Sequence, residues 1–374
     1  MTLSPPATRS VLVISHGFQP AYERGFCNGL VSVGHRVTLV TGARCDRLGL
    51  KPQIEVLALR GSQDEGRSAW AKMLNMARYH LALLAQVSGR RHDVVHVIGL
   101  IEPLWIVGVL EGLLLRLLAR RFVLTVHDLL PHDRHTAAAR RACRIAYRMP
   151  HALVVHTGRM ARELADDFDV TLQRITVMEH GLEPLPPSGS EAVSVDRLPM
   201  RLLCFGHVMP YKGVEVLIDA LSHVRTGCTL HVSGTCRDPE LARSLRARIR
   251  SSAASARITW CEDYVDDDRM RLLFEEADAV VLPYRHIDQS GVLMQALRHG
   301  APVVATRVGA FEDHVTPDVG ELCEPGSAGS LAAAIDRLAA RRTAFDRARI
   351  RAKAANLDWS GVVKALHRAY GARA

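Results

Sequence analysis

Short apolar runs alternate with amphipathic segments along the whole chain. Residues 10–15 (SVLVIS) form a continuous apolar run of strand length, and a helical pattern follows at 22–33 and ends at Gly34. Continuous apolar strands separated by helices are typical of parallel sheets that are covered on both faces. In the first half we expect further strands at 36–41, 93–97, 122–126, 152–156 and 175–177, and further helices at 68–88, 100–118 and 136–148.

The same alternation begins again after a break in composition. Residues 182–199 contain four prolines, small polar residues and no periodic pattern, which is typical of a linker. The sequence therefore predicts two doubly wound α/β domains, at 1–181 and 200–355. In the second domain we expect strands at 201–205, 229–233, 258–261, 279–282 and 302–305, and helices at 213–223, 239–251, 268–277, 291–298 and from 330 onward.

The net charge of +9 lies mostly in the first half of the chain. Residues 1–185 contain 23 Lys and Arg against 16 Asp and Glu, whereas the remainder contains 25 against 23. An anionic partner of the first domain, either a membrane surface or a phosphorylated acceptor, would explain this excess, and so would an ordinary solvated surface. Aromatic residues make up only 5% and are not interleaved with the basic residues, so we expect no binding to nucleic acid.

The most apolar stretch, 100–118 (LIEPLWIVGVLEGLLLRLL), also contains Glu102, Glu111 and Arg116. Because each charge at the centre of a spanning helix costs roughly 2.5–3.5 kcal/mol, we expect a helix buried in the domain, with a helix resting on a membrane surface as the alternative. The N-terminus lacks the apolar core of a signal peptide, and the eight cysteines are scattered. These features favour a cytoplasmic location, with peripheral contact at the inner face of the membrane left open.

Two segments of the second domain carry candidate chemistry. GHVMPYKG at 206–213 follows a buried strand and opens a helix, so Lys212 would lie beside any anion bound at the helix start. In the second segment, Ser290 is a suitable N-cap, and the amides of Gly291 and Val292 would then point at a diphosphate. Gln295 lies one turn further on, within reach of a ribose. The alternatives are a solvent-facing lysine and an exposed helical glutamine.

Several longer motifs resemble glycosyltransferase family 4. In the second half these are FGHVMPYKGVEVLIDAL, ADAVVLPY, SGVLMQALRHGAPVVATRVGAFEDHV and VGELCEPGSAGSLAAAI, and in the first half VGHRVTLV, DVVH and TVHD. The resemblance implies the GT-B fold, in which two doubly wound Rossmann-like domains face each other across a cleft. It also implies retaining transfer from a nucleotide sugar, an acceptor-side domain at 1–181, a donor domain at 200–355 and a C-terminal helix at 356–374 that packs back on the first domain.

The resemblance also implies roles for single residues. Lys212 matches the lysine that contacts the donor diphosphate, and His207 stands where the family commonly has an arginine on the same phosphates. The amides of Ser290, Gly291 and Val292 match those that hold the phosphates, and His127 matches a histidine that faces the donor sugar. On the acceptor side, the polar motif that begins at His127 includes Asp128, His132 and Asp133.

The sequence departs from the family pattern at three places. The family usually has two glutamates eight residues apart: here Gln295 replaces the second, and the first falls approximately on Asp288, because the loop is one residue shorter. The glycine pair after the first strand is reduced to Gly17, which we expect to bind the donor, with His16 beside it on the acceptor side. We expect Asp288 to hydrogen-bond sugar hydroxyls. Asp288, Lys212 and His127 are the three expected catalytic residues.

The run Asp266-Asp267-Asp268 raises the question of a metal, since some glycosyltransferases bind a divalent ion through an acidic triplet. Because the run precedes a helical pattern, we expect a helix cap instead. The resemblance implies no metal and no cofactor. The expected function is sugar transfer from a nucleotide sugar to a hydroxyl acceptor, which would be a glycan, a lipid-linked molecule or a secondary metabolite. A non-catalytic partner protein with the same fold, or a sugar-nucleotide epimerase, is the alternative.

Overall fold

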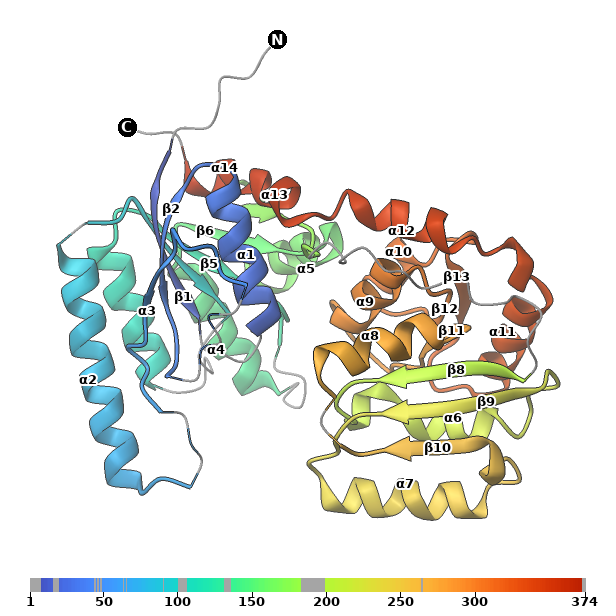
Figure 1. The fold of residues 1–374 in the computed structure, drawn as a ribbon. Coiled ribbons are helices and arrows are strands. Elements are labelled where there is room, and N and C mark those ends of the chain that lie inside the picture. Colours follow the sequence, from blue (N-terminus) through green and yellow to red (C-terminus); the bar gives the residue numbers. More distant parts are fainter. Residues whose placement is uncertain are drawn as a thin grey trace, which may run out of the picture. The chain divides into compact units, whose positions relative to one another are not determined.

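The computed structural model divides the chain into two compact units (Figure 1). Unit 1 comprises Met1–Glu183 and Leu357–Ala374, and unit 2 comprises Pro184–Asn356. The structure describes residues 8–15, 20–43, 45, 47, 49–62, 64, 66–89, 91–99, 106–130, 136–182, 199–263 and 265–371. The predicted linker, 182–199, lies outside the described residues except for its first and last positions.

Unit 1 is built on a seven-stranded parallel sheet with the order β3-β2-β1-β4-β5-β6-β7. Its strands are β1 (Ser10–Ser15), β2 (Arg36–Val40), β3 (Glu55–Leu57), β4 (Val94–Ile98), β5 (Phe122–Thr125), β6 (Ala152–Val155) and β7 (Ile175–Val177). Its helices are α1 (Pro20–Ser32), α2 (Ala69–Ser88), α3 (Ile106–Leu118), α4 (Ala137–Arg148), α5 (Gly158–Phe168), α13 (Trp359–Val362) and α14 (Leu366–Tyr370). One apolar core joins α2, α3, α4 and α5 to one face of the sheet, and α1 crosses over on the other face.

Unit 2 is built on a six-stranded parallel sheet with the order β10-β9-β8-β11-β12-β13. Its strands are β8 (Met200–Phe205), β9 (Cys228–Ser233), β10 (Ile258–Cys261), β11 (Ala279–Leu282), β12 (Val303–Thr306) and β13 (Gly320–Cys323). Its helices are α6 (Val214–Ala220), α7 (Pro239–Ser251), α8 (Asp267–Glu276), α9 (Gly291–His299), α10 (Phe311–His314), α11 (Ala328–Ala340) and α12 (Arg347–Ala355).

Both sheets reverse their winding at one internal strand, β1 in unit 1 and β8 in unit 2. At such a point the loops that leave two neighbouring strands turn to opposite faces, which opens a crevice at the carboxyl ends of the strands. In unit 2 the two strands are β8 and β11, so the loops that begin at Gly206 and Pro283 border the crevice. Ligand sites of doubly wound sheets lie at this position.

The last segment of the chain is anchored in unit 1 by Trp359. A Cβ atom added to Gly25 would lie 2.0 Å from Nε1 of the indole, and one added to Gly181 would lie 2.2 Å from Cδ2. The backbone amide of Leu182 also donates to the carbonyl of Leu357 over 2.7 Å. The indole therefore occupies a notch that exists because these positions carry no side chain.

The predicted strands and helices are present, with their ends shifted mostly by one to three residues, and the structure adds four strands and helices. The added elements are β3, β13, α5 and α10. β3 (EVL) and β13 (GELC) each contain a glutamate, so neither gives a continuous apolar run, and α5 (GRMARELADDF) buries only one narrow stripe of a polar sequence. One expectation was wrong: α3 is not a buried helix, because four of its leucines are exposed.

Candidate functional site

Lys212 is held at the carboxyl edge of the second sheet by a tight turn. Gly206, with φ of 91°, turns the chain away from β8, and a short 3-10 turn at Pro210–Lys212 leads to Gly213 at the start of α6. The Lys212 side chain is only 7% exposed. Its Nζ atom donates to the carbonyl of Phe205 over 3.4 Å and lies 5.5 Å from the centre of the Tyr284 ring. Burial lowers the pKa of Lys212 to about 8.

The ammonium group of Lys212 and the first turn of α9 face the same small space. A Cβ atom added to Gly206 would lie 2.9 Å from Nζ of Lys212 and 3.5 Å from Cγ2 of Val292. Ser290 caps the helix, since its hydroxyl oxygen accepts from the amide of Leu293 over 3.3 Å. The first amides of a helix have no partner within it, so those of Gly291 and Val292 are available to a ligand. The sequence predicted both features, and the structure brings them together.

This arrangement favours an anion. Within the part of the chain that the structure describes, no carboxylate lies within ion-pair distance of Lys212. Because a buried charge is stable only beside an opposite charge or in a hydrogen-bonded cage, the ammonium group calls for an anionic ligand. The positive end of the α9 dipole adds to the same preference.

His207 lies at the exposed edge of this site. Its Nδ1 atom is 2.7 Å from the hydroxyl of Thr235. Partial burial, followed by the charges of Arg237 and Lys212, lowers the pKa of His207. The imidazole is therefore neutral near pH 7 and can serve a phosphate as a hydrogen-bond donor rather than as a cation. Sequence analysis missed Thr235 and Arg237, although both follow β9, the strand next to β8.

Two of the three departures from the family pattern, Gln295 and Asp288, lie in or just before α9. Gln295 is half-buried one turn into α9, where its Oε1 atom accepts from Arg298 over 3.4 Å. Asp288 lies two residues before the cap, in a loop held by a bond from the amide of Ala310 to the Asp288 carbonyl, 3.2 Å long. The expected contacts of both side chains with a donor remain predictions.

In unit 1, His127 follows β5 and contacts a second histidine. Because Thr125 pairs with Val154, the register places His127 opposite His156. The distance from Nδ1 of His127 to Nε2 of His156 is 3.1 Å, and Nδ1 of His156 lies 3.0 Å from the carbonyl oxygen of Met178. Sequence analysis missed His156, although both histidines follow adjacent strands.

These two bonds fix the tautomers of both rings. The Met178 carbonyl can only accept, so Nδ1 of His156 carries the proton, and Nε2 of the neutral ring is an acceptor. Nδ1 of His127 must then be the donor in the bond between the rings. Burial lowers the pKa of His127 to about 3 and that of His156 well below its usual value. Nε2 of His127 is therefore a bare acceptor at neutral pH.

Aromatic rings surround this histidine pair. The Tyr22 ring centre lies 4.6 Å from that of His127, 5.7 Å from that of His156 and 5.1 Å from that of His180. Trp359 closes the cluster at 4.9 Å from Tyr22. Burial lowers the pKa of His180 to about 4, so the cluster is uncharged near pH 7.

Only part of the predicted acceptor side falls on described residues. Asp128 is half-buried beside His127, and its carbonyl accepts from the Tyr147 hydroxyl over 3.4 Å. The other predicted acceptor-side residues lie outside the described residues: His16, His132 and Asp133. Gly17, which was predicted to bind the donor, lies outside them as well. Their proposed roles stay predictions.

The acidic triplet forms the predicted helix cap. Asp266 caps α8, with its side chain accepting from the amide of Arg269 over 2.8 Å, and Asp267 and Asp268 lie in the first turn. Across the described ranges, no group of three or more His, Cys, Asp or Glu side chains is placed to hold a metal ion.

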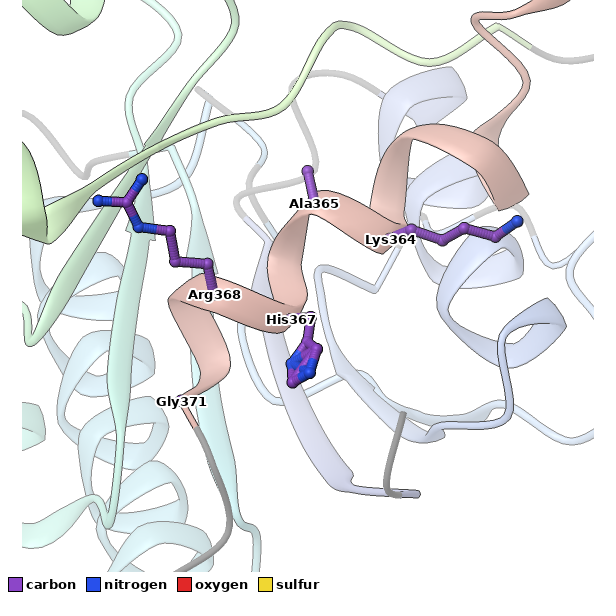
Figure 2. Close-up of a pocket in the computed structure, with 5 residues that line it drawn as sticks. All are labelled: Lys364, Ala365, His367, Arg368 and Gly371. Atoms are coloured by element: carbon purple, nitrogen blue, oxygen red, sulfur yellow. The ribbon is translucent and has the colours of Figure 1, made fainter. Parts of the chain in front are cut away.

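A shallow hollow of about 440 Å³ lies elsewhere, along the C-terminal helices of unit 1. It is lined by Lys364, Ala365, His367, Arg368 and Gly371, and the charged ends of Lys364 and Arg368 point in opposite directions (Figure 2). Since the basic groups do not converge, this hollow offers no anion site comparable to that of Lys212.

Comparison with known proteins agrees with this description. The family model Glycosyltransferase Family 4 matches residues 22–184, and the model Glycosyl transferases group 1 matches residues 199–341. The lipopolysaccharide core biosynthesis mannosyltransferase LpsB of Rhizobium meliloti (strain 1021) is 30% identical over 263 residues, which cover 67% of this chain and 70% of that protein.

Two further similarities are more limited. The GDP-mannose:glycolipid 4-beta-D-mannosyltransferase of Xanthomonas campestris pv. campestris is 36% identical over 109 residues, 29% of this chain, and the match covers only 30% of that protein's length. The structure of sucrose-phosphate synthase from Thermosynechococcus elongatus aligns with a TM-score of 0.75 at 17% identity, covering 96% of both chains.

The two doubly wound parallel sheets and the structural similarity to sucrose-phosphate synthase define the GT-B fold. The chain belongs to glycosyltransferase family 4.

No helix within the described residues is both long and apolar enough to cross a bilayer.

Proposed function

We propose that this protein transfers a hexosyl or related sugar from a nucleotide sugar to a hydroxyl group of an acceptor. The observation that carries the proposal is the buried Lys212 ammonium, which faces the N-terminus of α9 and has no carboxylate partner among the described residues. A nucleoside diphosphate supplies the anion that this site requires, and it is the leaving group of the proposed reaction.

The bond changes explain why the site carries positive potential. The bond between the anomeric carbon and the diphosphate oxygen breaks, and a bond from the acceptor oxygen to the same carbon forms. The acceptor hydroxyl proton passes to the departing diphosphate. Negative charge grows on the diphosphate as the sugar becomes oxocarbenium-like. Lys212, His207 and the amides of Gly291 and Val292 stabilise that charge.

The other candidate residues hold the sugars. Nε2 of His127 accepts a hydrogen bond from a sugar hydroxyl, and its low pKa favours this role over removal of a proton. Asp288 bonds hydroxyls of the donor sugar, and Gln295 bonds the ribose without adding charge. Asp128, His132 and Asp133 form the acceptor side of the proposed site.

Retention of anomeric configuration and independence from metal belong to the proposal and follow from the family resemblance. The acceptor then attacks on the face from which the diphosphate leaves. The name of the Xanthomonas relative specifies a β-D-mannosyl product. The configuration of the product, determined by NMR, is therefore the measurement that tests retention, and an inverted product would contradict it.

We place the protein in the cytoplasm, with a glycan or lipid-linked acceptor. The Xanthomonas relative is named for transfer to a glycolipid, and the Rhizobium relative for biosynthesis of the lipopolysaccharide core, which supports an acceptor of this class. The excess of basic residues in the first half of the chain is consistent with an anionic acceptor or membrane surface.

The central test compares Lys212→Ala with Lys364→Ala, an exposed lysine of unit 1. Binding of UDP and GDP is measured by calorimetry, and hydrolysis of UDP-glucose and GDP-mannose by water measures donor cleavage without an acceptor. We expect Lys212→Ala to lose about 100-fold or more in donor cleavage, while Lys364→Ala matches the wild type. Wild-type cleavage by Lys212→Ala would contradict the proposal, and diphosphate binding without any cleavage by the wild type would favour a non-catalytic partner protein.

A further inference from the structure

Helix α3 carries its apolar side chains on the solvent side. Leu110, Leu113, Leu114 and Leu117 are exposed, the last of them by 75%, and their spacing places them on one stripe of the helix. Glu111 and Leu115 point inward, and Glu111 is only 5% exposed. An ordinary surface helix has the opposite arrangement, with its charges outside and its leucines inside.

Contacts of Glu111 hold α3 in this orientation. Its Oε1 atom accepts from the Tyr79 hydroxyl over 3.2 Å, and its Oε2 atom lies 3.2 Å from Nε2 of His80. Both partners belong to α2, which packs beside α3. Rotating α3 to bury its leucines would expose this carboxylate and break both contacts, so the outward leucines are a property of the folded unit.

Helix α2 presents a similar stripe. Trp70, Met73, Leu74, Leu81 and Leu84 are exposed, with Trp70 at 72%, whereas Tyr79, Leu83 and Val87 are buried on the opposite side. The two helices lie side by side on the same face of the sheet (Figure 1). We refer to the exposed stripes of α2 and α3 together as the outer apolar face.

The exposed charges of α2 and α3 are basic. Helix α2 contains no acidic residue, and Glu111, the only acid of α3, is buried. Lys72 and Arg78 of α2 and Arg116 of α3 are exposed. Helix α4, which is next to α3, adds four exposed arginines: Arg140, Arg141, Arg144 and Arg148. Arg140 forms an ion pair with Asp167, and Arg144 and Arg148 form ion pairs with Asp169, so four arginines against two aspartates leave a basic excess beside α3.

We propose that the outer apolar face of α2 and α3 docks on a membrane surface that contains anionic lipids. Apolar side chains on one face of a helix enter the boundary between headgroups and acyl chains, while the basic rim pairs with lipid phosphates. A second copy of this chain fits less well, because a two-fold contact would bring the basic rims of both copies together. The proposal rests on α2, α3 and α4 alone and stands independently of the proposed sugar transfer.

The test is flotation of the full-length protein with vesicles of phosphatidylcholine, with and without phosphatidylglycerol. We expect binding to the vesicles that contain phosphatidylglycerol, and weaker binding at high salt because ions screen the basic rim. The double variant Leu113→Gln/Leu117→Gln should reduce that binding about tenfold or more, since two leucines no longer enter the interface. Arg78→Gln/Arg116→Gln should reduce binding to the vesicles that contain phosphatidylglycerol and make that binding less sensitive to salt, because two charges of the basic rim are removed.

The matched control is Leu172→Gln/Leu272→Gln, which alters two leucines that are exposed elsewhere on the chain. It should bind as the wild type does, and thermal unfolding shows whether each variant remains folded. Equal vesicle binding by the wild type and by Leu113→Gln/Leu117→Gln would overturn the proposal. The proposal would also be overturned if the wild type does not float with the vesicles and forms a dimer in light scattering that Leu113→Gln/Leu117→Gln removes. The outer apolar face would then join two copies of the chain.

Discussion

Nδ1 of His127 donates a hydrogen bond to Nε2 of His156 across the carboxyl ends of β5 and β6, over 3.1 Å. His156 in turn donates from Nδ1 to the Met178 carbonyl. A main-chain carbonyl thus determines, through one intervening ring, which nitrogen of His127 carries the proton. His156 is a positioning residue in this scheme, because it acts on a substrate only through His127.

Loss of this bond should impair turnover. In His156→Phe the His127 ring loses its acceptor and can adopt the other tautomer, so we expect kcat to fall about 10- to 100-fold, as is typical when a group that orients a functional histidine is removed. His156→Gln can place an amide oxygen near the position of Nε2 and should keep more activity than the phenylalanine variant. The measurement is kcat and KM for the donor, with nitrogen-15 NMR of the histidine rings.

The NMR spectrum gives a result that does not depend on activity. Wild-type His127 should show its proton on Nδ1 throughout pH 5 to 8, since its pKa lies near 3. A protonated Nε2 on His127 would contradict the tautomer assignment even if the variants lose activity.

Diphosphate binding should weaken on the alkaline side. The pKa of Lys212 is lowered to about 8, so its ammonium group loses its proton as the pH rises through this value, while the ligand phosphate is already fully ionised. We expect the Kd for UDP or GDP to rise between pH 7 and 9.5, by at most tenfold per pH unit above 8. Calorimetry of Lys212→Met, which has no ionisable group, should show weaker binding that stays constant over this range; a parallel rise in both proteins would assign the effect to another group.

The Trp359 notch should matter for stability. The Cβ atom of Gly25→Ala would lie 2.0 Å from the indole, which is buried and has little room to move. We expect a loss of roughly 1–3 kcal/mol, as is typical of overpacking. Gly158→Ala is the control, because nothing lies within 4 Å of its added Cβ atom and Gly158 begins α5. Denaturant unfolding should leave that variant unchanged or slightly more stable, and equal effects at both sites would argue against the notch.

The contact between Glu111 and His80 should make stability depend on pH. The bond to Glu111 raises the pKa of His80 above its usual value of 6.5. The resulting stabilisation is fully present below pH 6.5 and is lost as the pH rises through the higher folded-state pKa. Glu111→Gln should therefore lower the free energy of unfolding more at pH 6 than at pH 8.5, as measured by urea denaturation. If the loss of free energy of unfolding in Glu111→Gln does not change with pH, Glu111 does not raise the pKa of His80.

Local patterns were sufficient to predict the Lys212 site. Gly206, Lys212, Ser290 and Gly291 all lie where a buried strand ends and a helix begins, and a strand-turn-helix segment places its residues at the carboxyl edge wherever it occurs in the sheet. The cap at Asp266 followed from the same kind of local signal. His156 and Tyr22 could not be found in this way, because they meet His127 only through strand order and register.

The sequence by itself determined the two parallel α/β units, since continuous apolar runs must be covered on both faces. It also determined the turn at Lys212 and the cap at Ser290 that border the proposed anion site, since turns and caps are formed by neighbouring residues. Only the tertiary structure decided which face of α3 points outward, because a helix that is apolar nearly all round has no preferred inner side until Tyr79 and His80 bind Glu111. It also decided which histidine adjoins His127 and where Trp359 is anchored. Those outcomes depend on pairings between residues far apart in the chain, which periodicity does not encode.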